Sequence, residues 1–121
     1  MEGCRYLWYN TIIRPNLGGE EKTGKKVEPI KTPDYERRMA AIRDERAKAR
    51  IAFRIMRLCG GNAGDVQPVG EGVSEMRIHY GPGYRVYYKQ RGSEIVILLL
   101  AGTKNRQSED IALAKRIAAN Y

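Results

Sequence analysis

Polar side chains alternate along two neighbouring stretches of the chain, residues 75–79 and 85–89, and together they suit the cleavage of RNA. Both stretches alternate polar and apolar residues, as half-buried strands do. The Gly-Pro-Gly sequence at 81–83 is typical of a tight turn, so the two strands are expected to pair as a hairpin. In that pairing the polar side chains share one face of the sheet. They are Glu75, Arg77, His79, Arg85, Tyr87 and Lys89.

Cleavage of RNA without a metal needs three kinds of group around one phosphate. An acceptor must take the proton of the ribose 2′-hydroxyl, a donor must protonate the leaving 5′-oxygen, and cations must stabilise the phosphoryl oxygens. Arg77 and Arg85 would supply fixed donor forks, and a histidine such as His79 can act as base or acid near neutral pH. Glu75 is the alternative base, and Tyr87 would donate a hydrogen bond or stack on a base.

The hypothesis depends on convergence of the two arginines. Arg77 and Arg85 must point toward each other and must not be buried in pairs with carboxylates. Lys104, in the polar loop after the apolar stretch 95–101, extends the catalytic set, and Lys89 and Arg106 are expected to bind RNA. The alternative interpretation is a solvated hairpin face of ordinary mixed charge without catalytic activity.

Other kinds of site find little support in the sequence. The glycines at 70–72 and 81–83 are not followed by helical sequence, as a dinucleotide fingerprint would require. One histidine and two distant cysteines, Cys4 and Cys59, do not make a zinc site of the usual kind. The carboxylates are scattered, which does not suit a magnesium centre. We therefore expect neither a metal nor another cofactor, and we expect reduced thiols in a cytoplasmic protein.

Size and charge favour one domain with a polyanionic partner. The chain has 121 residues, enough for one hydrophobic core. It carries 22 basic and 14 acidic residues, and its formal net charge of +8 favours nucleic acid through counterion release. A basic protein without a nucleic-acid role is the alternative. The longest apolar stretch, 95–101, has the length of a buried strand and not of a membrane span.

Residues 27–59 are expected to form a short edge strand and then helical structure. Pro29 removes one ladder donor from the strand at 27–31. Thr32 suits a helix N-cap and Pro33 the first helical position, and helical sequence continues to Cys59. This span is one helix, or two that form a hairpin if Asp44 caps the second.

The second half of that helical span has a basic face. Apolar residues recur at helical spacing from Ala47 to Leu58, and arginines recur beside them. A solvated face is the ordinary interpretation, and binding of a partner is the other. The arginines are Arg46, Arg50, Arg54 and Arg57.

Residues 73–121 are expected to complete an α+β fold. The hairpin strands are followed by a strand at 95–101 that is apolar on both faces, so it should be central and covered on both sides. Ser108 suits the N-cap of a final helix. The predicted fold class is an antiparallel sheet packed against an N-terminal helical hairpin, with a C-terminal helix.

Residues 1–26 are expected to form an N-terminal extension to a domain at 27–121. Glycines and charged residues at 18–26 are typical of a flexible linker. The apolar stretch 6–13 suits a strand, a docked tail, or a translated upstream region from a start codon placed too early.

The pattern of motifs in the second half of the chain resembles a known family. The HigB-like, phage-derived addiction module killer proteins of the RelE/ParE toxin superfamily have a similar Gly-Asn-x-Gly-Asp loop and Gly-Pro-Gly-Tyr-Arg hairpin at this spacing. The resemblance covers residues 27–121. The stretches that carry it are 50–58, 61–65, 68–73, 75–78, 81–87, 98–100, 102–104 and 107–111.

The resemblance implies a RelE-like fold and the toxin of a type II toxin–antitoxin system. Such a toxin cleaves translated messenger RNA, often on the ribosome, and a cognate antitoxin, commonly a helix-turn-helix protein, holds it inactive. By position, Arg85 matches the arginine after the hairpin turn, Arg77 a basic residue on the preceding strand, and Lys104 a basic residue after the last strand. The four helical arginines are then candidate antitoxin contacts.

The resemblance leaves the activity open. The superfamily also contains proteins that inhibit DNA gyrase and do not cut RNA, and the fold alone does not decide between them. A binding module that only pairs with its antitoxin is a third hypothesis. The converging acid, base and cations expected on the hairpin favour an endoribonuclease, because an inhibitor needs none of them there.

Overall fold

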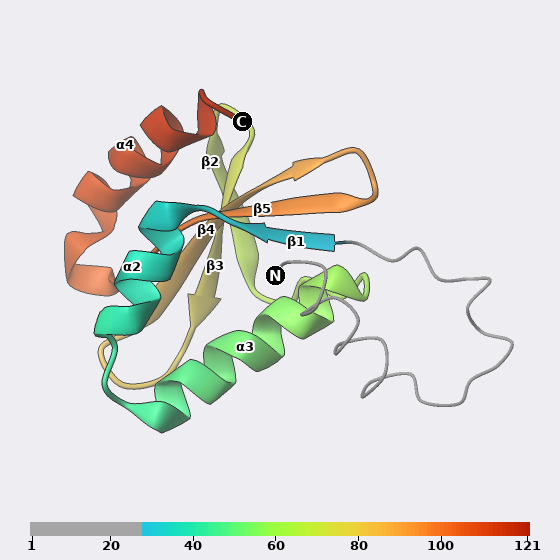
Figure 1. The fold of residues 1–121 in the computed structure, drawn as a ribbon. Coiled ribbons are helices and arrows are strands. Elements are labelled where there is room, and N and C mark those ends of the chain that lie inside the picture. Colours follow the sequence, from blue (N-terminus) through green and yellow to red (C-terminus); the bar gives the residue numbers. More distant parts are fainter. Residues whose placement is uncertain (1–27) are drawn as a thin grey trace, which may run out of the picture.

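A computed structural model describes residues 28–121 of the chain (Figure 1). The extension expected at 1–26 lies outside the described residues. Eight helices and strands follow in the order β1 (Glu28–Lys31), α2 (Pro33–Ala41), α3 (Glu45–Cys59), β2 (Val66–Gly70), β3 (Val73–Ile78), β4 (Tyr84–Arg91), β5 (Ile95–Thr103) and α4 (Gln107–Ala118). The class is α+β. None of the described helices has the length and apolar character needed to cross a lipid bilayer.

The five strands form one mixed sheet in the order β1-β5-β4-β3-β2. β2, β3, β4 and β5 pair in antiparallel fashion, and the predicted hairpin of β3 with β4 is confirmed. β1 pairs with β5 in parallel, so the prediction of an antiparallel sheet is wrong at this edge. The reason is that the chain passes through α2, α3 and three further strands before it returns beside β1. β2 was not predicted, because its run from Val66 to Gly70 is short and contains Pro68.

Two helices, not one, lie between β1 and β2. Thr32 caps α2 by accepting a hydrogen bond from the Tyr35 amide at 3.0 Å, as predicted. The chain becomes extended at Ile42, and Asp44 then caps α3 by accepting from the amides of Arg46 and Ala47. Ser108, in contrast, is not the cap of α4. A short 3₁₀ turn at Lys104–Arg106 leads directly into that helix, which begins at Gln107.

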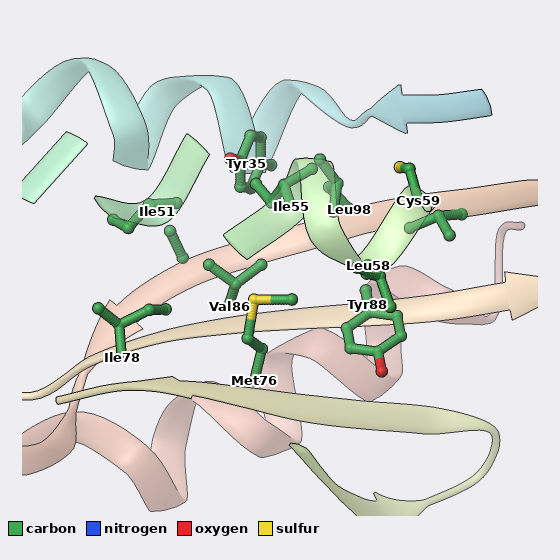
Figure 2. Close-up of a cluster of buried hydrophobic side chains, with 12 residues drawn as sticks. Tyr35, Ile51, Ile55, Leu58, Cys59, Met76, Ile78, Val86, Tyr88 and Leu98 are labelled. Carbon is green, nitrogen blue, oxygen red and sulfur yellow. The ribbon is translucent and has the colours of Figure 1, made fainter. Parts of the chain in front are cut away.

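The sheet is covered on both faces. One cluster of buried apolar side chains lies between the sheet and α2 and α3, and includes Ile51 and Met76 (Figure 2). A second lies on the opposite face under α4, and includes Leu99 and Ile117. β5 contributes to both clusters, so the prediction of a central strand with two covered faces is confirmed. Burial of both faces is the main driving force for this arrangement.

An ion pair between the half-buried Arg38 and the buried Asp110 joins α2 to α4. Asp110 is only 1% exposed, and its carboxylate accepts from Arg38 Nη1 at 3.3 Å and Nη2 at 3.2 Å. Arg38 Nη1 also donates to the Ala101 carbonyl on β5 at 2.8 Å. The polar loop that follows β5 is therefore anchored at its base by contacts between residues far apart in sequence.

The pair Arg38 and Arg37 offers a matched test of this anchor. We expect Arg38→Ala to lower the free energy of unfolding by about 3 kcal/mol, because it leaves the Asp110 carboxylate buried without a partner. Arg37, the next residue, pairs with Asp34 on the surface, so Arg37→Ala should cost less than about 1 kcal/mol. Urea unfolding measures both. Equal losses in the two variants would contradict this account of Asp110.

Candidate active site

The hairpin register brings the predicted side chains together. β3 and β4 pair so that Arg77 lies opposite Arg85 and Glu75 opposite Tyr87. The intervening residues, such as Met76, point into the core under α3. The prediction that alternate residues of β3 and β4 gather on one face is therefore confirmed for these four.

A hollow of about 930 Å³ opens over this face, a size typical of ligand sites. We call it the polar groove. Five of the six side chains predicted to be catalytic line it, and two glutamines add further polar groups to its walls. These residues are Glu75, Arg77, His79, Arg85, Lys104, Gln67 and Gln107.

Glu75 lies at the floor of the polar groove and is 2% exposed. Its Oε2 accepts from Gln107 Nε2 at 2.6 Å and from the Tyr87 hydroxyl at 3.3 Å. Ion pairs join it to Arg77 Nε at 3.5 Å and Arg85 Nε at 3.7 Å. A carboxylate enclosed in this way is a counter-charge for the arginines. These contacts occupy the carboxylate that was predicted as an alternative base, and they suit a group that positions the arginines.

The two arginines converge, as the hypothesis requires, but both also form ion pairs with the buried carboxylate of Glu75, which the hypothesis required them not to do. Glu75 does not satisfy them fully. Arg85 is 7% exposed, and its Nη1 reaches only the carbonyls of Gly83 and Tyr84, at 3.5 and 3.4 Å. Arg77 Nη2 donates to Gln67. The Nε atoms of both arginines are buried and have no hydrogen-bond partner among the described residues. Two guanidinium groups share one carboxylate, so the cluster keeps one positive charge.

His79 follows the end of β3 and pairs with Asp65. Its Nε2 lies 2.5 Å from Asp65 Oδ2, and the imidazole side chain is 70% exposed. The hydrogen bond from His79 lowers the pKa of Asp65, and the positive charge of Arg77 adds to this effect. The backbone of Asp65 is held by the Arg77 amide at 3.0 Å. A carboxylate that fixes one ring nitrogen orients the other, so His79 can act as a directed proton carrier.

Tyr87 has a role different from the predicted one. Its ring is 0% exposed, so it cannot stack on a base, and that part of the prediction is wrong. Burial, followed by the charge of Glu75, raises the pKa of Tyr87 far above its usual value. The neutral hydroxyl is thus kept as a donor to Glu75.

Lys104, predicted to be catalytic, and Lys89 and Arg106, predicted to bind RNA, lie in different places. Lys104 is exposed on the rim of the polar groove. Lys89 Nζ instead donates to the Ala118 carbonyl at the end of α4, at 3.3 Å, and does not line the groove. Arg106 pairs with Glu109 at 2.8 Å and lines a separate hollow beside Arg38. Neither Lys89 nor Arg106 lines the polar groove. β4 places Lys89 beside the end of α4, and the turn after β5 places Arg106 beside Glu109.

The four arginines of α3 also divide. Arg46, Arg50 and Arg57 are exposed. Arg54 is half-buried and donates to the carbonyls of Arg77 at 2.6 Å and Ala63 at 3.3 Å, and burial lowers its pKa. Arg54 therefore ties α3 to the end of β3 and is not free to bind a partner.

Three residues of the site were missed by sequence reasoning. Asp65 is the last residue of the loop that precedes β2. The glycines of this loop predict turns, and nothing in the local sequence marks the Asp65 carboxylate as part of a site. Gln67 lies on the unpredicted strand β2, and Gln107 begins α4. No local pattern distinguishes these two glutamines, because only packing brings them to Arg77 and Glu75. Within residues 28–121, no three His, Cys, Asp or Glu side chains cluster as a metal site would require.

Comparison with known proteins finds a relative in Haemophilus influenzae. A Haemophilus influenzae protein described as uncharacterized is 46% identical to this chain over 80 residues, which are 66% of this chain and 81% of that protein. No family model matches the chain. No solved structure matches it.

The buried Tyr87 predicts a loss of stability at alkaline pH. The pKa of Tyr87 is raised in the folded protein. Its contribution to the free energy of unfolding is therefore fully present at pH values below the pKa of an unfolded tyrosine, about 10. As pH rises further the unfolded chain releases this proton and the folded chain does not, so the free energy of unfolding falls. Tyr87→Phe should make that fall shallower in urea unfolding between about pH 9 and 11.

The exposed Tyr121 supplies the control for this measurement. Tyr121→Phe should leave the alkaline decline as steep as in the unchanged protein. An identical decline in Tyr87→Phe and Tyr121→Phe would show that ionisation of Tyr87 is not coupled to folding.

Proposed function

The chain belongs to the same family as the uncharacterized Haemophilus influenzae protein, and from its polar groove we propose that it is a metal-independent endoribonuclease. In this proposal it is the toxin of a type II toxin–antitoxin system, with a RelE-like fold. The motifs at 61–65 and 81–87 support the assignment, and so do the two helices before a largely antiparallel sheet and the helix after it.

One observation carries the proposal: the buried Arg85 and the half-buried Arg77 lie opposite each other across β3 and β4, and their Nε atoms are buried without a hydrogen-bond partner among the described residues. Buried donors without partners are rare, and each calls for an explanation such as a ligand. A phosphate would accept from such donors, and the surplus positive charge beside Glu75 favours an anion. The partial pairing with Glu75 weakens this field, but one carboxylate cannot neutralise two arginines.

The proposed reaction is attack by a ribose 2′-oxygen on the adjacent phosphorus. The 2′-oxygen forms a bond to phosphorus, the bond from phosphorus to the 5′-oxygen breaks, and a 2′,3′-cyclic phosphate and a 5′-hydroxyl result. His79, oriented by Asp65, accepts the 2′-hydroxyl proton. Arg77 and Arg85 stabilise the charge on the phosphoryl oxygens, and Lys104 is the assigned donor to the 5′-oxygen.

Partners and location follow from the same proposal. The substrate is translated messenger RNA in the cytoplasm, and a cognate antitoxin, of helix-turn-helix type, holds the toxin inactive. Inhibition of DNA gyrase and simple pairing with an antitoxin are the competing functions. Neither has a specific contact in its favour, and both are outcomes of the experiment below.

End mapping of cellular RNA after induction tests the activity. We expect new 5′ ends in messenger RNA, and a loss of about a hundredfold or more in their rate of appearance for Arg85→Ala, which removes a charged donor. Lys104→Ala should also reduce cleavage, and because Lys104 is exposed this variant retains the fold. Lys89→Ala is the matched control, since Lys89 is a cation of β4 that does not line the groove.

Three results would overturn the proposal. Cleavage that persists in both Arg85→Ala and Lys104→Ala would remove the polar groove from the reaction. DNA damage signalling without RNA cleavage would favour gyrase inhibition. Normal growth after induction, without new RNA ends, would favour a module that only pairs with its antitoxin.

His79 and Asp65 allow the proton transfer to be tested separately. His79→Ala should lower kcat by about a hundredfold or more, because general acid–base catalysis contributes that much. Asp65→Asn should lower kcat less and leave KM nearly unchanged, since the amide still holds the ring but no longer stabilises its positive form. Single-turnover cleavage of a defined RNA measures both. A change in KM alone would mean that His79 binds RNA and does not transfer a proton.

A further inference from the structure

A second hollow lies beside the polar groove, against α3. It has a volume of about 650 Å³ and is lined by Arg46, Ala49, Arg50, Phe53, Ile78 and His79, with Arg54 at its edge. We call it the α3 groove. The catalytic proposal uses only His79 of this set, so the remaining lining is unexplained.

Phe53 is the most unusual residue of the α3 groove. Its side chain is 53% exposed, and among the described residues only Tyr121 is another large apolar side chain on the surface. An aromatic ring on the surface can bury its apolar area against another molecule. Its surroundings are cationic, because Arg57 lies over the ring at 5.6 Å and Arg46 and Arg50 are exposed nearby.

The α3 groove and the polar groove are neighbours, and two contacts link their linings. His79 lines both hollows. Arg50 of the α3 groove also stacks on the ring of Tyr80, at 4.6 Å from the centroid, and Tyr80 lines the polar groove. The two hollows therefore lie close enough for adjacent parts of one ligand to be considered in both.

We propose that the α3 groove is a subsite for an unpaired nucleotide that flanks the scissile phosphate. The base stacks on Phe53, and Arg46 and Arg50 bind the phosphate of that nucleotide. Aromatic rings beside arginines are the usual means by which proteins hold single-stranded nucleic acid. The inference rests on the proposed ribonuclease activity and assigns part of its substrate.

An acidic segment of a partner protein is the competing occupant of this surface. Its charge would also suit the arginines. The position of the α3 groove beside the polar groove favours RNA. An RNA whose scissile phosphate lies between Arg77 and Arg85 has its next nucleotide on a surface beside the polar groove. Among the described residues, His79 lines both the polar groove and the α3 groove.

Binding of a short single-stranded RNA with 2′-fluoro substitutions tests the subsite, because such RNA lacks the attacking hydroxyl and is not cut. Fluorescence anisotropy with the full chain should give an affinity for Phe53→Ala about five- to a hundredfold weaker than for the unchanged protein. Phe53→Trp retains an aromatic ring that can stack on a base, so its affinity for this RNA should be similar to that of the unchanged protein or higher. Tyr121→Ala, the loss of the other exposed ring, is the matched control and should have no effect.

A series of RNAs with one abasic position each identifies the stacked base. At one position the abasic change should weaken binding to the unchanged protein as much as Phe53→Ala does, and it should add nothing further in that variant. Arg46→Gln should reduce the dependence of log affinity on log salt by roughly one, whereas Arg37→Gln on α2 should not change it.

The outcomes separate this inference from the proposed function. Cleavage and binding that are identical in Phe53→Ala and the unchanged protein would overturn the subsite alone and leave α3 as a surface for a protein partner. Binding with the expected abasic signature but without cleavage of ordinary RNA would support the subsite and overturn the nuclease. Absence of both binding and cleavage in the unchanged protein would overturn both.

Discussion

The buried carboxylate of Glu75 is the interaction on which the candidate site depends. Moving a carboxylate and a guanidinium out of water costs several kcal/mol each, and only close opposite charge and hydrogen bonds offset this cost. Glu75 receives both, from Arg77 and Arg85 on either side and from Tyr87 and Gln107. The same contacts hold the two arginines side by side, which their mutual repulsion would otherwise oppose.

A second constraint fixes the edge of the site where β3 ends. Arg54 reaches from α3 to the carbonyls of Ala63, Asp65 and Arg77. The Arg77 amide donates to the Asp65 carbonyl from the other side. Asp65 is thereby held against His79, and the helix that carries the α3 groove is held against the strand that carries the polar groove. The half-buried Arg54 guanidinium thus links the elements that carry the two hollows.

The sheet supports this arrangement because it is covered on both faces. Helix α3 packs on one face, and α4 packs on the other, where its first residue, Gln107, meets Glu75. Arg38 and Asp110 tie α2 to α4 and to β5, next to the loop that carries Lys104. The polar groove is therefore built between rigid elements, which suits a site that must hold charges in fixed positions.

Local patterns in the sequence determined the caps of α2 and α3, the shared face of the hairpin strands and the burial of β5. Thr32 and Asp44 cap their helices because a cap depends only on the next few residues. Alternation along β3 and β4 fixed which side chains share a face, because the period of a strand is two, and so Arg77 and Arg85 were found together. The double burial of β5 followed from its unbroken apolar sequence.

Tertiary structure alone decided how those side chains are used. The enclosure of Glu75, the burial of Tyr87 and the pairing of His79 with Asp65 join residues from separate segments, and no local pattern encodes such contacts. The parallel pairing of β1 with β5 and the diversion of Lys89 to the end of α4 have the same origin. Packing determines which charged side chains stay accessible to solvent and which are paired inside the protein. That difference decides whether a charge is available to a ligand or stabilises the fold.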